Sequence, residues 1–597
     1  MQLAAIDWII IVFFLLLFLA IGFYYKEKAG KSMSDFFLSG RNLPWYIAGA
    51  SMVATTFAAD TPLAVTELVA KNGISGNWLW WNMLIGGMLT TFFFAKLWRR
   101  ANILTELEFI EIRYSGKEAA FLRGFKSVYM GLFINSLIIG WVNIALVSII
   151  HVFFGISEAY SLWIVAGAMC LTVFYSALSG LWGVAITDVI QFGLAMLGCI
   201  ILAVIVVTSD KIGGISGLKE KLPEWSLNFF PSITKNTSGG DIARTLSITV
   251  GAFFAFIGVQ WWASWYPGAE PGGGGYIAQR MMSCKDEKHS VYATLFFQIA
   301  HYCIRPWPWI IVGLCSLVLY PELAVDDKKL GYVMAMKDFL PTGFKGMMLI
   351  AFFSAYMSTI STQLNWGSSY IVNDFYKRFL KPEKSFASKE KAEKNYVACG
   401  RIATVLIMVV SMIVTPQIRS ISKVWEFMIE CGAGLGMVLI LRWYWWRINA
   451  WSEITATIFP FLAYGFAKLY LEKLVPQSYI DNRFSYFFTV GTTTVAWLLI
   501  TFLTKPTNKN TLSTFYKNIR PDGMWKPFKE INGEEKKSNM TPLFMCWLFS
   551  IIMIYSILFC SGKVIFAEWT SALMWLITAV VSFLILRFFM LRTSIFD

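Results

Sequence analysis

Hydroxyl side chains interrupt one otherwise apolar stretch of the chain, residues 346–376. They are Ser354, Ser358, Thr359, Ser361 and Thr362, followed by the amide Asn365. Ala355, Ser358 and Thr359 are three and four positions apart, so a helix would present them on one face. Oxygen atoms gathered in this way suit a hard cation such as sodium. Small hydroxyl residues also let membrane helices pack closely, so the spacing leaves both interpretations open.

Two other stretches combine an ionisable residue with residues that break helices. Residues 54–62 (ATTFAADTP) contain Asp60, and residues 266–275 (YPGAEPGGGG) contain Glu270. Proline removes a backbone donor and glycine unwinds easily, while an ionisable group at membrane depth marks a pathway or a pair. The breaks lie five predicted spans apart, which fits a five-plus-five inverted repeat. Loops between shorter helices would give the same pattern.

The elements that carry these residues are expected to be membrane helices. Of 597 residues, 57% are hydrophobic and only 15% are charged, and the mean hydropathy is +0.57. Soluble domains carry roughly 25% charged residues, so the composition excludes a soluble multidomain enzyme and a disordered chain. The nine cysteines show no CxxC spacing, which excludes a disulfide scaffold. The net charge of +14 is concentrated in short loops and predicts membrane orientation, not nucleic-acid binding.

Apolar runs of about 20 residues predict an all-α integral membrane protein with about fifteen transmembrane helices. They lie near 5–25, 43–71, 77–98, 121–155, 160–178, 182–207, 246–280, 291–320, 346–376, 399–417, 422–445, 450–472, 485–504, 541–562 and 567–592. The first run has no basic start and is followed by lysines, so we expect it to be retained with the N-terminus outside. The basic clusters then all fall on the cytoplasmic side, as does the C-terminus. These clusters are Lys96–Arg100, Arg280–Lys288, Lys377–Lys394, Arg442–Arg447, Lys505–Lys537 and Arg587–Arg592. We expect a multi-pass protein of the plasma membrane, in a bacterium the inner membrane.

The spans suggest five parts. An extra transmembrane helix and a cytoplasmic linker occupy 1–42, and the first repeat, with core helices one to five, occupies 43–207. An external loop at 208–245 leads to the second repeat at 246–446, with core helices six to ten. Four further transmembrane helices and a basic cytoplasmic linker at 505–540 make up 447–597.

Four short segments resemble those of a known family. Residues 35–45 (DFFLSGRNLPW) with 49–51 (GAS) resemble the opening signature of the sodium:solute symporter family. Residues 175–191, which contain YSALSGL and TDVIQ, resemble its second signature, and YIAQR at 276–280 and NDFY at 373–376 resemble two later segments. Their order matches over roughly residues 1–450. The resemblance implies a leucine-transporter-like core in spans two to eleven, with the last two helix pairs beyond what most members carry.

The resemblance also implies one sodium site between the first and eighth core helices. Its ligands would be the carbonyls of Ala54, Phe57 and Ala355 and the hydroxyls of Ser358 and Thr359. This is the hydroxyl face described above. Asp188 matches an acidic residue near that site, which could relay or attract the cation. Sodium is the only cofactor that we expect.

The solute contacts depart from those of the sugar-transporting members. Thr61 follows the acidic Asp60 where those members have glutamine, Trp425 beside Glu426 replaces a second glutamine, and His301 replaces a lysine. Aromatic residues surround these positions and could stack on a sugar, hold a cationic group or form structural belts. They are Trp80, Trp81, Trp261, Trp262, Trp265, Tyr266 and Trp425. We expect the solute site to include Asp60, Thr61, Trp81, Trp262, Glu270, His301, Arg305, Trp425 and Glu426.

Arg305 lies one helical turn after His301 and allows two interpretations. It could hold a carboxylate or phosphate of the solute in a bidentate grip, or it could pair with Glu270 and brace the unwound segment. A single membrane histidine such as His301 is more often a donor that bridges helices than a ligand, and zinc lacks matching ligands.

We therefore predict a secondary active transporter that couples inward sodium flow to uptake of a small polar solute by alternating access. Hydroxyls and aromatics favour a sugar or a sugar derivative, and with Arg305 a sugar acid. The alternatives are sodium- or proton-coupled uptake of an organic anion or amino acid, and an integral membrane enzyme. Such an enzyme would have only three histidines for its nucleophile–base sets, His151, His289 and His301. The expected partners are the solute and membrane lipid, without nucleic acid or an obligate protein partner.

Overall fold

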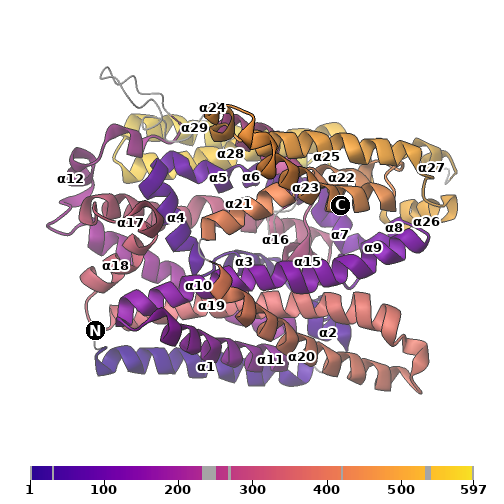
Figure 1. The fold of residues 1–597 in the computed structure, drawn as a ribbon, viewed down its shortest axis with the longest axis horizontal. Helices are drawn as coiled ribbons and strands as arrows, with labels where there is room; N and C mark the ends of the chain where they lie inside the picture. The colour runs from indigo at the N-terminus through magenta and orange to yellow at the C-terminus, as the bar shows by residue number, and fades with distance from the viewer. Residues whose placement is uncertain are drawn as a thin grey trace.

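A computed structural model describes residues 3–29, 32–231, 250–265, 271–418, 421–531 and 539–593. Within these ranges the chain is helical, and β structure is limited to isolated bridges between single residues (Figure 1). The predicted all-α fold class is confirmed.

The first half begins with two helices that precede the predicted core, α1 (Ala5–Ala29) and α2 (Met33–Leu38). The helices of the first predicted repeat follow: α3 (Trp45–Thr55), α4 (Asp60–Asn72), α5 (Trp78–Trp81), α6 (Met83–Leu89), α7 (Ala95–Ala101), α8 (Glu108–Arg113), α9 (Lys117–Val128), α10 (Asn135–Phe154) and α11 (Glu158–Val207). The π-helical segments η3 (Thr90–Phe94) and η4 (Tyr129–Ile134) join α6 to α7 and α9 to α10.

The second half begins after α12 (Gly214–Lys221). It contains α13 (Val250–Phe254), α14 (Trp261–Ala263), α15 (Gly275–Ser283), α16 (Glu287–Ile299), α17 (Pro306–Leu319), α18 (Leu330–Phe339), α19 (Phe344–Ser369), α20 (Lys389–Val414), α21 (Ile421–Cys431) and α22 (Leu435–Tyr444). Three more π-helical segments lie here: η7 (Ala255–Gln260), η8 (Ala300–Ile304) and η10 (Tyr370–Leu380).

The C-terminal part adds long helices on the side of the molecule opposite α1 (Figure 1). Its helices are α23 (Ala450–Leu469), α24 (Gln477–Asp481), α25 (Phe484–Leu503), α26 (Lys509–Ile519), α27 (Lys526–Ile531), α28 (Met540–Ile565) and α29 (Trp569–Met590). The pairs α23 with α25 and α28 with α29 pack along their lengths.

Ten helices among the described residues are long and apolar enough to cross a membrane, judged by length and composition. Each of them coincides with a span predicted from the sequence. The other five predicted spans fall on shorter or interrupted helices: α3 with α4, α5 to α7, the first part of α11, α13 to α15, and α21 with α22. The total of fifteen transmembrane helices stays a prediction.

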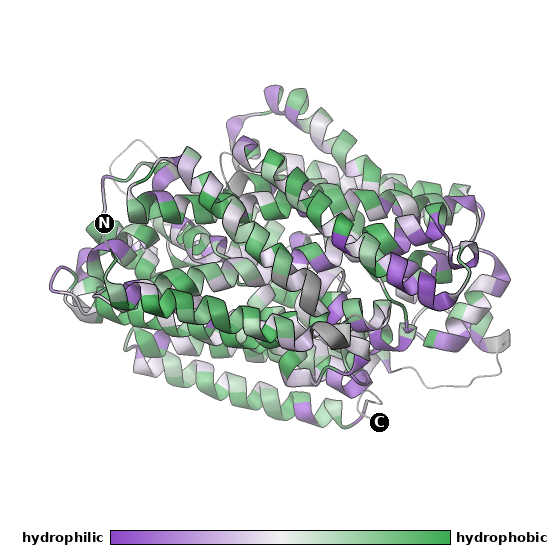
Figure 2. Cartoon of the chain, turned by 90° about the horizontal axis from the view of Figure 1, so that it is seen from below, coloured by the Kyte–Doolittle hydropathy of each residue, from purple (hydrophilic) through white to green (hydrophobic). Residues whose placement is uncertain are grey.

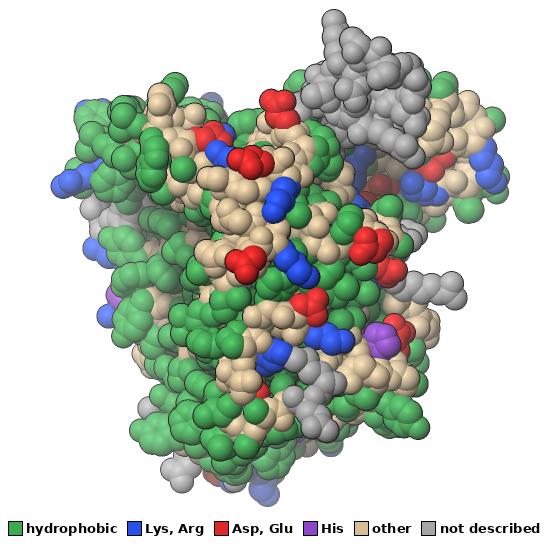
Figure 3. Space-filling model, turned by 90° about the vertical axis from the view of Figure 1, so that its left-hand side faces the viewer, with side chains coloured by type: hydrophobic (Ala, Val, Ile, Leu, Met, Phe, Trp, Pro, Cys, Tyr) green, Lys and Arg blue, Asp and Glu red, His purple; other side chains and the backbone are tan. Residues whose placement is uncertain are grey.

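The surface agrees with a membrane-embedded molecule. Figure 2 shows apolar residues along the long helices, with hydrophilic residues gathered mainly near their ends. Figure 3 looks onto the end at which the N-terminus, α12 and α18 lie, where acidic and basic side chains are spread over the face between apolar flanks. Side chains such as Ile9 on α1 and Leu573 on α29 are more than half exposed, as expected for helices that face lipid.

The break predicted at 54–62 lies between α3 and α4. Helical geometry stops at Thr55 and resumes at Asp60. Pro62 falls in the first turn of α4, where a missing N–H costs nothing because that donor has no intrahelical acceptor. Proline therefore permits the restart of the helix, and the unwound residues precede it.

The second break lies between α14, which ends at Ala263, and α15, which begins at Gly275. Gly272 and Gly273 have positive φ angles of 82° and 71°, a conformation that glycine adopts without strain. Tyr266 and Glu270 lie outside the described residues.

Glycine makes two further interruptions possible, one between two predicted spans and one within a predicted span. Gly180 has φ 55° and ψ −162° within α11, between the predicted spans 160–178 and 182–207. The span predicted at 422–445 was expected to be one helix, but it is interrupted between α21 and α22, where Gly434 has φ 95°. A hydropathy profile does not reveal this interruption, because the flanking residues are apolar on both sides.

The interruption between α21 and α22 accommodates the end of α14. The amide of Trp265 donates to the carbonyl of Gly432 (3.0 Å), and the amide of Gly434 donates to the carbonyl of Ala263 (2.8 Å). A Cβ atom on Gly432 would lie 2.3 Å from the Trp265 carbonyl oxygen, and one on Gly436 would lie 2.4 Å from that of Trp262. These are backbone atoms of the second broken helix, so the approach requires glycine.

We expect Gly432→Ala to lower the free energy of unfolding by about 1–3 kcal/mol, the range for overpacking a close contact. Gly465→Ala is the matched control, because nothing lies within 4 Å of a Cβ there. The control should leave stability unchanged or raise it by up to about 1 kcal/mol through helix propensity. Thermal unfolding of the purified protein in detergent measures both. Equal stability of the two variants would contradict the packing described.

Candidate functional site

An internal cavity of about 120 Å³ lies where α3 gives way to α4. One water needs about 10–15 Å³ of such space, so several waters or a small solute would fit. The lining comes from α3, α4, α5, α6, α10, α15, α16, η8, α19 and α21 together with residues at the break. The cavity therefore brings both predicted repeats together.

Five of the predicted solute residues line this cavity, and three do not. Those that line it are Asp60, Thr61, His301, Arg305 and Trp425. Those that lie elsewhere are Trp81, Trp262 and Glu426. The ninth, Glu270, lies outside the described residues.

The adjacent tryptophans of α5 have different surroundings. Trp81 is fully buried and packs against Trp78 and Phe559. Trp80 lines the cavity instead and stacks on Tyr302, with ring centroids 5.6 Å apart and planes 20° apart. Neighbouring helix positions point about 100° apart, so the aromatic cluster in the sequence could not show which of the two faces the cavity.

Trp262 and Glu426, the other two predicted solute residues that do not line the cavity, lie in different surroundings. The indole N–H of Trp262 donates to the Gly258 carbonyl one turn earlier (2.7 Å). Glu426 is exposed on α21.

Arg305 holds the end of the broken helix. One terminal nitrogen donates to the carbonyl of Val53 (3.1 Å) and to Oγ1 of Thr56 (2.8 Å), and the other donates to the carbonyl of Thr56 (2.9 Å). Its guanidinium also lies over the rings of Phe57 and Trp309, at 5.6 and 5.1 Å from their centroids. A cation beside the free carbonyls at the C-terminal end of α3 is favoured by the helix dipole. Arg305 therefore braces the first break, whereas the expected pairing with Glu270 falls outside the described residues.

His301 meets the same threonine. Its Nδ1 lies 3.1 Å from Oγ1 of Thr56, and that hydroxyl also lies 2.9 Å from the carbonyl of Val53. Thr56 was not identified from the sequence as a site residue. Its position within the break was the available signal, since a hydroxyl there can satisfy groups that the helix releases.

The predicted sodium residues lie close to one another at the break. Oγ1 of Thr359 donates to the carbonyl of Thr55 (3.0 Å), which joins α19 to the last turn of α3. Oγ of Ser358 donates to Oδ1 of Asp188 on α11 (2.5 Å). Ala54, Phe57 and Ala355 are also buried. Each hydroxyl gives its proton to an acceptor, so its lone pairs remain for a cation.

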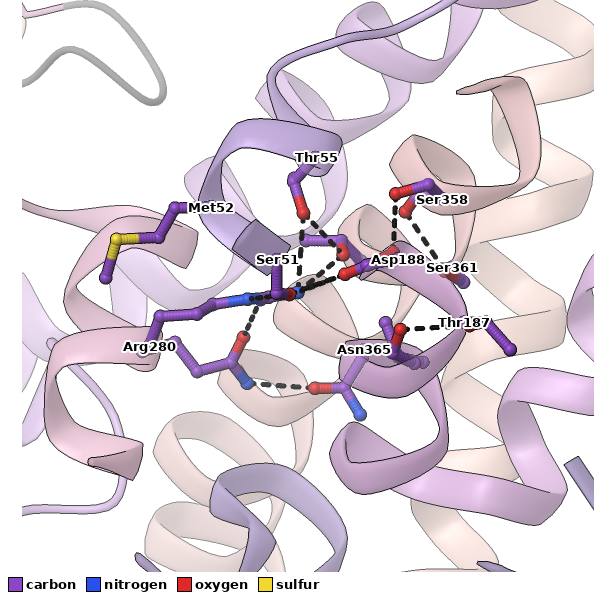
Figure 4. A network of polar contacts seen from close by, with 12 residues as sticks. Ser51, Met52, Thr55, Thr187, Asp188, Arg280, Ser358, Ser361 and Asn365 are labelled. Carbon is purple, nitrogen blue, oxygen red and sulfur yellow. Dashed lines mark hydrogen bonds and ion pairs between the residues drawn. The ribbon is translucent and has the colours of Figure 1, made fainter. Parts of the chain in front are cut away.

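Asp188 lies at the centre of a buried polar network (Figure 4). Its Oδ2 accepts from Oγ of Ser51 (2.5 Å) and lies 3.8 Å from a terminal nitrogen of Arg280. Arg280 also donates to Oγ1 of Thr362 (2.7 Å) and, through Nε, to Ser51 (3.2 Å). Residues of α3, α11, α15 and α19 are joined in this way.

Arg280 does not lie in a basic cytoplasmic loop, so that prediction from the sequence is wrong for this residue. It is fully buried within α15 and paired with Asp188. Ser51 and Arg280 both lie in the segments that carried the family resemblance, which was the available signal. Composition cannot separate a buried arginine from a loop arginine, because the pairing partner is about ninety residues away in the sequence.

We expect Arg280→Gln to destabilise the fold by about 3–5 kcal/mol, because it leaves the Asp188 carboxylate buried without its counter-charge. Arg280→Gln combined with Asp188→Asn should be less destabilised than Arg280→Gln alone. The exposed Arg401 is the control, and Arg401→Gln should stay within about 0.5 kcal/mol of the parent. Thermal unfolding in detergent gives the comparison. A single Arg280 variant as stable as the parent would contradict the buried pair.

Comparison with known proteins agrees with this architecture. The sodium:solute symporter family model matches residues 36–459. A sodium/glucose cotransporter of Vibrio parahaemolyticus is 24% identical over 76% of this chain and 84% of its own. A sodium/myo-inositol cotransporter 2 of Oryctolagus cuniculus is 21% identical over 85% of this chain and 78% of its own. A solved sodium-coupled sialic acid symporter, substrate-bound and outward-open, superposes with a TM-score of 0.62 at 19% identity, over 85% of this chain and all of that one.

The chain belongs to the sodium:solute symporter family. Its fold is the leucine-transporter-like five-plus-five inverted repeat, as predicted. It is a multi-pass membrane protein, a transporter and not an enzyme, and sodium is its coupling ion.

Proposed function

We propose that this protein takes up a sugar or another polyol across the plasma membrane, driven by the sodium gradient. The observation that carries the proposal is that the hydroxyl face of α19 and the break after α3 adjoin the cavity. Thr359 contributes to both, because it bonds the carbonyl of Thr55 and lines the cavity together with Thr55. A cation and a solute at these positions would stabilise the same arrangement of the two repeats.

The sodium ligands in this proposal are the carbonyls of Ala54, Phe57 and Ala355 and the hydroxyls of Ser358 and Thr359. Their support is the proximity of α3 and α19 and the free lone pairs of the two hydroxyls. Asp188 acts as a neighbour that orients Ser358 through a 2.5 Å hydrogen bond. Because bound sodium and bound solute favour one conformation, each tightens the binding of the other by the same factor.

The solute class is supported by the cavity walls and by the relatives. Trp80, Trp141 and Trp425 line the cavity, and aromatic faces stack well on sugar rings. The two cotransporters cited above are named for glucose and myo-inositol, both neutral polyhydroxy compounds, and the solved symporter is named for sialic acid.

We place the N-terminus outside and the C-terminus in the cytoplasm, in a bacterium at the inner membrane, from the distribution of basic residues.

Buried charges lie at the end of the molecule that we assign to the cytoplasm. Glu106 accepts from the amide of Gly275 at the start of α15 (2.6 Å) and from the hydroxyl of Tyr370 (2.9 Å), and it pairs with Arg442 (3.3 Å). Nearby, Lys126 pairs with Glu453 (2.5 Å). We infer that these contacts separate when the solute leaves toward the cytoplasm, which is the second half of an alternating-access cycle.

The proposal predicts sodium-driven accumulation in proteoliposomes. Labelled glucose, galactose, mannose and myo-inositol should be tested with an inward sodium gradient and with equal potassium. At least one should accumulate only with sodium, because the gradient supplies the free energy of uptake. Uptake that is equal in potassium, or that follows a pH gradient in place of sodium, would contradict sodium coupling.

The cation site predicts a second result. Ser358→Ala combined with Thr359→Ala removes two oxygen ligands and should raise the sodium half-saturation of uptake by at least about ten-fold. Asp188→Asn should raise it less, because that group is a neighbour. Ser368→Ala is the control on the same helix, since its hydroxyl donates to the Asn365 carbonyl (3.1 Å) and bonds no other group in the described part of the chain. A normal half-saturation in the double variant would show that the ligands lie elsewhere.

A further inference from the structure

Two buried acceptor atoms in the cavity lack a hydrogen-bond partner among the described residues. They are Oδ1 of Asp60 and Oε1 of Gln363. Asp60 is 3% exposed and Gln363 is 2% exposed, and both line the cavity. Buried acceptors without a donor are costly, and native structures rarely leave them so unless a ligand or water completes them. Each of these two oxygen atoms therefore needs a hydrogen-bond donor from a ligand or a water.

His301 supplies a third acceptor. The Thr56 hydroxyl has one proton, which it gives to a main-chain carbonyl, that of Val53 at 2.9 Å or Met52 at 3.1 Å. The hydroxyl accepts from Arg305, so its contact with His301 is best satisfied by an N–H on Nδ1 of the imidazole. In that tautomer the imidazole is neutral, and Nε2 carries a lone pair.

The terminal nitrogens of Arg305, the cationic residue of the cavity, already have other partners, and its Nε has none among the described residues. Three donor contacts of Arg305 go to Val53 and Thr56 at the end of α3. Its charge is also the formal counterpart of Asp60, the one carboxylate among the lining residues that the structure describes. A solute carboxylate would add a second negative charge beside Asp60 in a site of low dielectric, where like charges repel strongly.

We propose, on the basis of the function proposed above, that the solute is a neutral polyol that donates hydroxyl hydrogen bonds to Asp60, Gln363 and His301. The same three acceptors select against the corresponding sugar acid. They are specificity-determining residues, and the structure thereby favours a neutral sugar over the sugar acid that the sequence had suggested.

The test compares matched neutral and acidic ligands on the intact protein. Binding to the purified protein in detergent should be measured by calorimetry in sodium buffer and in potassium buffer. The ligands are glucose with glucuronate, galactose with galacturonate, mannose with mannuronate, and myo-inositol. We expect at least one neutral ligand to bind in sodium, with its uronate at least about ten-fold weaker. A uronate that binds as tightly as its neutral partner, or more tightly, would overturn the proposal.

Substitutions at the proposed contacts test which residues cause the preference for the neutral ligand over its uronate. Asp60→Asn should bring the uronate to within about three-fold of its neutral partner, because the repelling charge is gone. Gln363→Leu should weaken the neutral ligand by at least about ten-fold, because a buried acceptor is lost. Gln298→Leu is the matched control: Gln298 is equally buried and its Oε1 also lacks a partner among the described residues, but it does not line the cavity. The control should keep the affinity within about two-fold.

The outcomes separate this inference from the proposed function. Sodium-dependent binding with an unchanged ratio in Asp60→Asn, or an equal loss in Gln363→Leu and Gln298→Leu, overturns the role of the acceptors and leaves sodium-coupled transport intact. Absence of sodium-dependent binding for every ligand of the panel overturns the proposed function and this inference together. The ligand ratio of the parent protein needs no variant, so a variant that fails to fold does not prevent the test.

Discussion

The structure depends on satisfying backbone polar groups where a membrane helix stops. Between α3 and α4 the chain releases carbonyls that water would bond in a soluble protein, and lipid offers no donors to replace it. Arg305 donates to Val53 and Thr56, and Thr359 donates to Thr55. These contacts fix α3 against the segment before α17 and against α19. The break is thereby held beside the cavity, which Thr55 and Thr56 line.

Buried ionisable side chains elsewhere in the molecule are also satisfied by specific partners. Asp188 is buried, but Ser51, Ser358 and Arg280 satisfy its oxygens. Glu106 holds the amide of Gly275 at the start of α15. Both networks include α15, the helix that follows the second break. A movement of α15 would therefore affect the cation region and the contacts assigned to the cytoplasmic end together, which is the coupling that alternating access requires.

The helices beyond the family match pack on the core through polar contacts with its backbone. On α28, Trp547 donates to the carbonyl of Ile85, and Tyr555 donates to that of Trp81. In the linker, Trp525 donates to the carbonyl of Trp443, and its ring lies 5.1 Å from the guanidinium carbon of Arg113. The linker thus packs against α8 and α22, close to the ion pairs assigned to the cytoplasmic end.

The sequence by itself determined the properties that depend on local composition and spacing. Long apolar runs predicted the membrane helices, Pro62 and the glycines after Pro271 predicted both breaks, and the spacing of Ser358 and Thr359 predicted a hydroxyl face. Tertiary structure decided what depends on packing between distant segments. It placed Trp80 rather than Trp81 at the cavity, paired Arg280 with Asp188, and directed Arg305 to the carbonyls of α3. It also interrupted the span at 422–445, because the end of α14 approaches Gly432 too closely for any side chain. Helical periodicity fixes the face on which a residue lies, but the partner on that face is set only when the helices meet.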